Sequence, residues 1–296
     1  MGNGGVEGKD SFYLRVGRIS SLMMFTEMRA KILCIVEVSI VFGLMVGLFR
    51  FVTSIPWIPS LSESFAGFLF PGYAVLLMVS FFLYIFRCPP QPCSAWPEKL
   101  KYQASIIAYG FFPIFVLSAF LNWLDWNQWS GAVLISILEM GLLVWFAWMS
   151  KGKPAWQNSG IVGSFLLFAV ASHAFPRLGN VTLAVMYFYL FVGLGEELLF
   201  RGYIQSRLNS VFGCPKHFLG IHWGWGLIMA SVFFGLWHFD WQLSMLKWPQ
   251  VLWTMFGGVV FGFVREKSES VIAPAILHGL LNYGPQAILY YLLWNK

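Results

Sequence analysis

Six polar residues in the C-terminal third of the chain stand inside very apolar stretches, and their types are those that hydrolytic enzymes use. The set comprises Glu196, Glu197, Arg201, His238, His278 and Asn282, in a sequence that is 58% hydrophobic. A charged residue at the centre of a membrane helix costs about 2.5–3.5 kcal/mol on insertion scales, so such residues usually have a function. A structural ion pair with buried, hydrogen-bonded histidines is the alternative. Six such residues in one segment favour a functional site.

The first group is Glu196-Glu197-Leu198-Leu199-Phe200-Arg201, which we expect within one helix over about 180–212. Glu197 and Arg201 are four residues apart and can form an ion pair on one helix face. Glu196 is rotated from Glu197 by about 100° and points elsewhere. Because a dry environment makes a carboxylate a stronger base, Glu196 is the predicted general base, with Glu197 and Arg201 in support.

The second group is Phe234-Gly235-Leu236-Trp237-His238, near the end of another apolar segment. Glu196 and His238 lie at similar distances along the chain from a probable turn around residues 213–220. Two antiparallel helices would therefore bring the two side chains level. A carboxylate and an imidazole at the same depth can hold one water molecule between them.

The third group is His278-Gly279-Leu280-Leu281-Asn282 in the last apolar segment. A spacing of four residues places the imidazole and the amide on one helix face. Two donors aimed at a common point can form an oxyanion hole for attack on an amide carbonyl. A polar clamp between helices is the structural alternative. Gly279 would allow another helix to approach closely.

The ordered motifs Glu-Glu-x-x-x-Arg, Phe-x-x-x-His and His-x-x-x-Asn in apolar helices resemble the CAAX prenyl protease and bacteriocin-processing family of intramembrane endopeptidases. The resemblance covers roughly residues 180–290. It implies that Glu196 and His238 activate the hydrolytic water and that His278 and Asn282 stabilise the oxyanion. It also implies a membrane-anchored or prenylated protein or peptide as substrate, within the lipid bilayer. The sequence does not choose among the substrates of the family.

A glutamate and two histidines also form a known catalytic zinc set. We favour a mechanism without a metal or other cofactor, since the His-Glu-x-x-His motif is missing and no obvious carboxylate orients either histidine. Asn282 also suits an oxyanion role better than metal ligation. Zinc remains the chemical alternative.

A protein of another class, such as a proton-coupled transporter or a scaffold that kept the fold, would also bury Glu and His residues. A transporter of this kind is expected to show internal symmetry between its halves. Residues 1–176 contain no matching Glu or His pattern, which favours the enzyme.

The elements that position these residues are predicted to be membrane helices. A mean hydropathy of +0.69 and 11% charged residues indicate an all-α, polytopic transmembrane bundle. Apolar segments of nearly spanning length cover residues 32–49, 65–86, 104–124, 131–149, 159–176, 180–200, 222–239, 250–264 and 271–294. Segments 159–176 and 250–264 are short or interrupted by Gly, so one of them could be re-entrant. We therefore expect eight or nine helices.

No linker long enough to separate domains is evident, so we divide the chain by the expected role of each segment. We expect a polar segment at 1–31, helices of unassigned role at 32–176 and a protease-like core at 177–296. Within 32–176 only Glu37 and Glu139 are predicted to be buried carboxylates, and contacts within the bundle are the favoured role for both. The tryptophans of the core, including Trp237, are expected to anchor helices at the membrane interfaces.

The distribution of basic residues predicts the orientation. Fifteen of the 19 Lys and Arg residues fall in the N-terminal segment and in loops on the same side of the membrane. The positive-inside rule therefore predicts a cytoplasmic N-terminus and an external C-terminus. Membrane topology and anionic headgroups also account for the net charge of +6. No basic, aromatic-interleaved patch indicates nucleic-acid binding.

Overall fold

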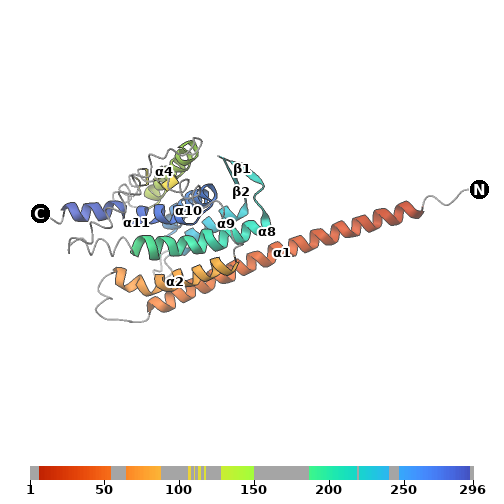
Figure 1. Ribbon diagram of the computed structural model, residues 1–296, viewed down its shortest axis with the longest axis horizontal. Helices are drawn as coiled ribbons and strands as arrows, with labels where there is room; N and C mark the ends of the chain where they lie inside the picture. The colour runs from red at the N-terminus through yellow and green to blue at the C-terminus, as the bar shows by residue number, and fades with distance from the viewer. Residues whose placement is uncertain are drawn as a thin grey trace, which may run out of the picture.

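The structure, a computed structural model, consists of helices and one short hairpin (Figure 1). It describes residues 7–54, 65–87, 106–107, 110, 113–114, 117, 128–149, 187–218, 220–239 and 247–293. The long helices are α1 (Glu7–Ser54), α2 (Phe65–Arg87), α4 (Trp129–Met149), α9 (Trp225–Trp237), α10 (Trp248–Ser268) and α11 (Ile272–Leu293). The predicted all-α class is confirmed for these residues, with the hairpin as an addition.

A continuous helical stretch precedes the hairpin and agrees with the helix predicted over about 180–212. It is built from η3 (Tyr187–Leu194), α7 (Gly195–Glu197), η4 (Leu198–Gln205) and α8 (Ser206–Phe212). The two η segments are π-helical, which the sequence did not indicate.

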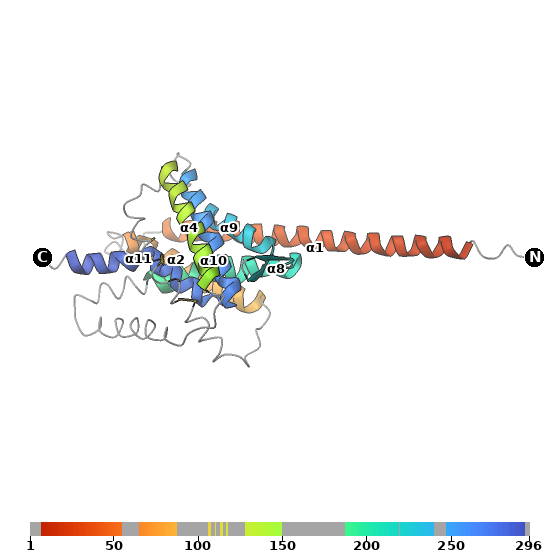
Figure 2. The same cartoon turned by 90° about the horizontal axis from the view of Figure 1, so that it is seen from above.

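Helix α1 begins at Glu7, well ahead of the apolar segment predicted from residue 32. Its part Met24–Ser54 is, among the described residues, the one helix long and apolar enough to cross a membrane. The N-terminal half of α1 projects beyond the other helices in both ribbon views (Figures 1 and 2). The count of eight or nine membrane helices stays a prediction, since segment 159–176 and most of 104–124 lie outside the described residues.

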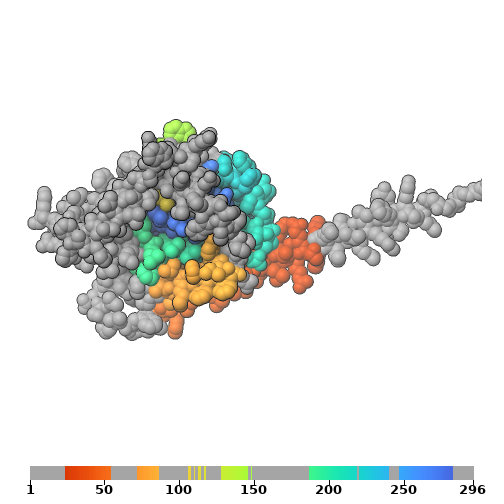
Figure 3. All heavy atoms as spheres, in the orientation of Figure 1, coloured from red at the N-terminus to blue at the C-terminus, as the bar shows by residue number. Residues whose placement is uncertain are grey.

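Helix α10 is continuous over 21 residues and extends beyond the short apolar segment predicted at 250–264. It packs between α9 and α4 (Figure 2). On the other side of the molecule, α2 lies on the outer face beside the helical stretch that starts at Tyr187 (Figure 3).

The turn predicted around residues 213–220 is an antiparallel hairpin of β1 (Lys216–Phe218) and β2 (Ile221–Trp223). Gly220 has a φ of 80°, a left-handed conformation that glycine adopts without a steric penalty. The hairpin joins α8 to α9, which pack against each other.

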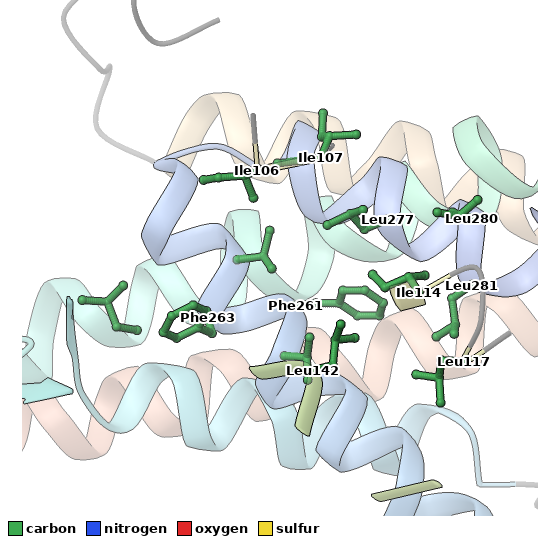
Figure 4. Close-up of a cluster of buried hydrophobic side chains, with 14 of the residues drawn as sticks. Ile106, Ile107, Ile114, Leu117, Leu142, Phe261, Phe263, Leu277, Leu280 and Leu281 are labelled. Atoms are coloured by element: carbon green, nitrogen blue, oxygen red, sulfur yellow. The ribbon is translucent and has the colours of Figure 1, made fainter. Parts of the chain in front are cut away.

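Two apolar clusters hold the helices together. In the first, Phe261 of α10 meets Leu277 and Leu280 of α11, with Ile114 and Leu142 beside them (Figure 4). The second joins α1, α2, η4 and α9 through the buried side chains Val38, Leu76, Phe200, Tyr203 and Phe234. Helices far apart in the sequence are thereby fixed around the segment that carries Glu196.

Candidate active site

Glu196 and Glu197 lie in α7, a single α-helical turn between the π-helical segments η3 and η4. π-Helical turns are rare and often occur at functional sites. Ser206 donates its hydroxyl to the carbonyl oxygen of Arg201, five residues earlier (3.0 Å). Glu196, Glu197, Arg201 and the following Gln205 are all completely buried.

The two oxygens of Glu196 have different surroundings. Oε1 accepts hydrogen bonds from the Tyr73 hydroxyl (3.0 Å) and from Trp237 Nε1 (3.2 Å). Oε2 has no hydrogen-bond partner within the described part of the chain. It lies 4.0 Å from His238 Nε2 and 3.8 Å from His278 Nε2. One oxygen is held in place while the other faces both imidazoles.

Glu197 forms the predicted ion pair with Arg201. Its Oε1 accepts from Arg201 Nη1 (2.8 Å), and both side chains are fully buried. Arg201 also donates from Nη2 to the carbonyl oxygen of Gly258 on α10 (2.9 Å), and its guanidinium lies 4.4 Å from the ring centre of Phe234. A buried ion pair is tolerated when further hydrogen bonds and packing offset the loss of hydration.

Both histidines direct Nε2 toward Glu196 because Nδ1 is occupied. His238 Nδ1 lies 2.9 Å from the carbonyl oxygen of Phe234, and His278 Nδ1 lies 3.0 Å from Glu197 Oε1. Carbonyl and ionised carboxylate oxygens only accept, so Nδ1 carries the proton in both rings. His278 also stacks on Phe261, with ring centres 5.0 Å apart.

The close approach of α11 to η3 depends on glycine. A Cβ atom on Gly279 would lie 2.5 Å from Tyr189 Cγ and 2.8 Å from its Cα. Contacts this short are not possible for a real side chain, so the adjacent His278 reaches Glu197 because residue 279 is glycine. This agrees with the sequence-based expectation for Gly279.

Asn282 is the one predicted site residue that shares no hydrogen bond or ion pair with the others in the described part of the chain. It follows His278 by one helical turn on α11 and is half-buried. The His238 side chain is 23% exposed. Solvent exposure within the site therefore rises from the buried Glu196 and Glu197 toward His238 and Asn282.

Two residues that contact Glu196 were missed or misassigned. Trp237, expected at a membrane interface, instead donates to Glu196. Its position directly before His238 in the second motif was the available signal. Tyr73 lies on α2, in the region of unassigned role, and nothing in the sequence indicated its contact.

The donor types present are those of a zinc site. Glu196 Oε2, His238 Nε2 and His278 Nε2 are three acceptors that face one another. The sequence argument against zinc was wrong in one respect: the Glu197 carboxylate orients His278, as a carboxylate commonly does for a metal-bound histidine. Over the described residues, however, no group of three or more His, Cys, Asp or Glu side chains has the geometry of a metal site.

The fold and site define a helical protein with a membrane-capable helix and a dry cluster of carboxylates, arginine and histidines. Residues 178–284 match the family model described as type II CAAX prenyl endopeptidase Rce1-like. This part of the chain is therefore similar to the type II CAAX prenyl endopeptidases, the family that the three motifs resemble. The match contains all six predicted site residues and excludes α1, α2 and α4. Comparison with curated proteins and with solved structures gave no match.

Proposed function

We propose that the protein is an intramembrane endopeptidase that hydrolyses a peptide bond of a membrane-anchored or lipidated protein or peptide, using water activated by Glu196. The observation that carries this proposal is the placement of Glu196 Oε2, buried and unpartnered among the described residues, within 4.0 Å of two histidine Nε2 atoms. The family match supports peptide hydrolysis as the reaction class.

In this mechanism Glu196 and His238 hold the attacking water. Two hydrogen bonds of about 2.8 Å through one water span the 4.0 Å between Glu196 Oε2 and His238 Nε2. Glu196 removes one proton as the water oxygen attacks the carbonyl carbon. The other hydrogen stays on the water oxygen and donates a hydrogen bond to the Nε2 lone pair of His238. The contact between His238 Nδ1 and the Phe234 carbonyl oxygen fixes the tautomer that this role needs.

The carbonyl oxygen that becomes negative requires donors, and His278 and Asn282 are the proposed ones. His278 is placed for this role because Glu197 Oε1 holds its Nδ1, while its Nε2 lies 3.8 Å from Glu196 Oε2. When Nε2 also carries a proton, it donates to the oxyanion. The tetrahedral intermediate breaks its C–N bond, and the leaving amine takes the proton that Glu196 accepted.

The dry site suits a substrate that is already in the bilayer. The family description names prenyl endopeptidases, and we propose that the substrate of this chain also carries a prenyl group or another membrane anchor.

The cytoplasmic placement of the N-terminus is part of the proposal. Arg201, counted with a cytoplasmic loop in the orientation argument, is buried in an ion pair and carries no weight there.

Zinc is the variant of the same function that the donor set supports. Glu196, His238 and His278 would hold the ion, and the ion would supply a Lewis acid for the carbonyl oxygen and the water. The Glu197 carboxylate and the Phe234 carbonyl would keep the two imidazoles oriented.

Cleavage by the purified full-length protein in lipid nanodiscs tests the proposal. The substrates are a prenylated peptide, a peptide with a transmembrane anchor and the same soluble sequence without an anchor. Glu196→Gln and His238→Asn are expected to lower the rate at least a hundredfold, since general acid–base groups contribute 10²–10⁴-fold. Glu266→Gln is the matched control, because Glu266 pairs with Gln205, Asn209 and Arg265 away from this cluster.

Each outcome separates the possibilities. Activity that survives a strong zinc chelator supports the metal-free mechanism, and loss that added zinc restores supports the zinc variant. Equal cleavage of the anchored and unanchored peptides would contradict the substrate class. Cleavage by Glu196→Gln at the wild-type rate would reject the proposed function.

A further inference from the structure

We infer that Tyr73 of α2 is a positioning residue for Glu196, so that the working site includes a helix outside the family segment 178–284. The inference rests on the proposed function of Glu196. Helix α2 contacts η3, α7 and η4, which places it along the whole segment that carries the two glutamates.

The Tyr73 ring is held from two sides. It packs edge-on against Phe49 of α1, with ring centres 5.0 Å apart, and against Tyr187 of η3 at 5.9 Å. The neighbouring Gly72 lies so close to α1 that a Cβ atom there would be 2.6 Å from Thr53 Cγ2. The hydroxyl of Tyr73 is therefore directed at Glu196 by packing on both neighbouring helices.

Tyr73 and Trp237 donate to the same oxygen of Glu196. The indole of Trp237 is held by Phe49 and Phe200, with ring centres 5.1 and 6.1 Å away. Both donors bind Oε1, so a turn of the carboxylate away from this position breaks two hydrogen bonds. The arrangement keeps Oε2 directed at His238 and His278, where the water is proposed to bind.

Because two donors bind one oxygen, the inference predicts how the losses of rate in the single and double variants combine. With either donor removed the other still holds the carboxylate, whereas removal of both frees it. The loss of rate in the double variant should therefore exceed the product of the single losses. Two residues that only pack independently of each other would give losses that multiply.

The experiment measures kcat and KM for Tyr73→Phe, Trp237→Phe and the double variant with the anchored peptide that the wild type cleaves. Each single variant is expected to lose about tenfold in kcat, in keeping with a lost hydrogen bond to a charged group, with KM within about twofold of wild type. The double variant is expected to lose well over about a hundredfold in kcat.

Tyr84→Phe is the matched control. Tyr84 lies on the same helix, is also half-buried and packs its ring on Gly202 of η4. It loses the same hydroxyl without touching Glu196, and its kcat is expected to stay within about twofold of wild type.

The outcomes distinguish this inference from the proposed function. Wild-type kcat in Tyr73→Phe, or losses that multiply in the double variant, overturns the positioning role while an inactive Glu196→Gln leaves the proposed function standing. A fully active Glu196→Gln overturns both. Because Phe keeps the aromatic packing at both positions, the variants retain the contacts that fold this region.

Discussion

Two of the carboxylate–guanidinium pairs in the described part of the chain differ in burial and in how fully they are hydrogen-bonded. Glu37 of α1 pairs with Arg207 of α8 at 2.8 Å, and the two side chains are 25% and 28% exposed. Glu37 accepts from both Nε and Nη2 of Arg207 and also from the Tyr203 hydroxyl. Glu197 and Arg201 are completely buried, yet Glu197 Oε2 and Arg201 Nε have no partner among the described residues.

In the partly exposed Glu37–Arg207 pair, more of the hydrogen-bonding atoms thus have partners than in the buried Glu197–Arg201 pair. Stability alone would favour the opposite arrangement. Buried polar groups are nearly always hydrogen-bonded, and each exception requires an explanation. Three of these exceptions, Glu196 Oε2, Glu197 Oε2 and Arg201 Nε, belong to residues of the proposed site. The Glu37 pair joins α1 to α8, whereas the Glu197 pair belongs to the site that a substrate is proposed to complete.

Arg201→Met is expected to have the largest effect on stability. It leaves Glu196 and Glu197 buried without the guanidinium that faces them, and loss of one partner of a buried pair costs about 3–5 kcal/mol. Denaturant unfolding of the purified protein in detergent micelles measures this change.

The double variant Glu197→Gln with Arg201→Met is the control for the buried pair. It removes both charges of the pair, so it should recover a large part of the lost free energy of unfolding. A loss below about 1 kcal/mol in Arg201→Met would show that the buried pair contributes no more than a surface pair.

Gly279→Ala is expected to cost about 1–3 kcal/mol in the free energy of unfolding, since the added methyl group forces α11 away from Tyr189. Cleavage should fall as well, because His278 moves with the helix. Gly141→Ala on α4 has nothing within 4 Å of the added atom and should be neutral or slightly stabilising. Equal stability of the two variants would mean that α11 accommodates the methyl group.

Glu196→Gln is expected to raise the free energy of unfolding by about 1 kcal/mol while it abolishes cleavage. The amide removes a buried charge with an unpartnered oxygen, and replacing a strained functional group commonly stabilises a protein by this amount. The same unfolding assay measures the change. Destabilisation beyond about 1 kcal/mol would instead assign Glu196 a structural role like that of Glu37.

The sequence predicted contacts along and between neighbouring helices better than it predicted the architecture. The spacing of four residues placed Glu197 beside Arg201, and equal distances from the turn placed Glu196 level with His238. Both follow from helix geometry, which depends on local spacing. Helices α1 and α10 extend beyond the predicted apolar segments because charged residues at helix ends continue the helix while they end the apolar pattern.

Contacts between distant segments were not predictable from spacing. Tyr73 reaches Glu196 across 123 positions of sequence, and the carboxylate that orients His278 comes from 81 positions away. Glu139 is buried as predicted and lies against Gly257 of α10, and nothing in the structure assigns it a role. Such contacts depend on which helices pack against each other. The apolar surfaces through which helices pack are similar in many sequences, so they do not reveal the pairing.

Arg207→Gln is expected to have the smallest effect. Partly exposed ion pairs contribute about 0–1 kcal/mol because water screens the charges, so the loss in the free energy of unfolding should stay below about 1 kcal/mol. Salt screens such pairs further, and the difference from wild type should shrink between low and high ionic strength. Unfolding at two salt concentrations and a cleavage assay measure both effects. Cleavage should be unchanged because, among the described residues, the Arg207 side chain is hydrogen-bonded to Glu37 and Ser210 and to no residue of the Glu196 cluster. A large loss of activity in Arg207→Gln would mean that the two pairs are coupled through the helical stretch they share, and that the peripheral pair also maintains the site.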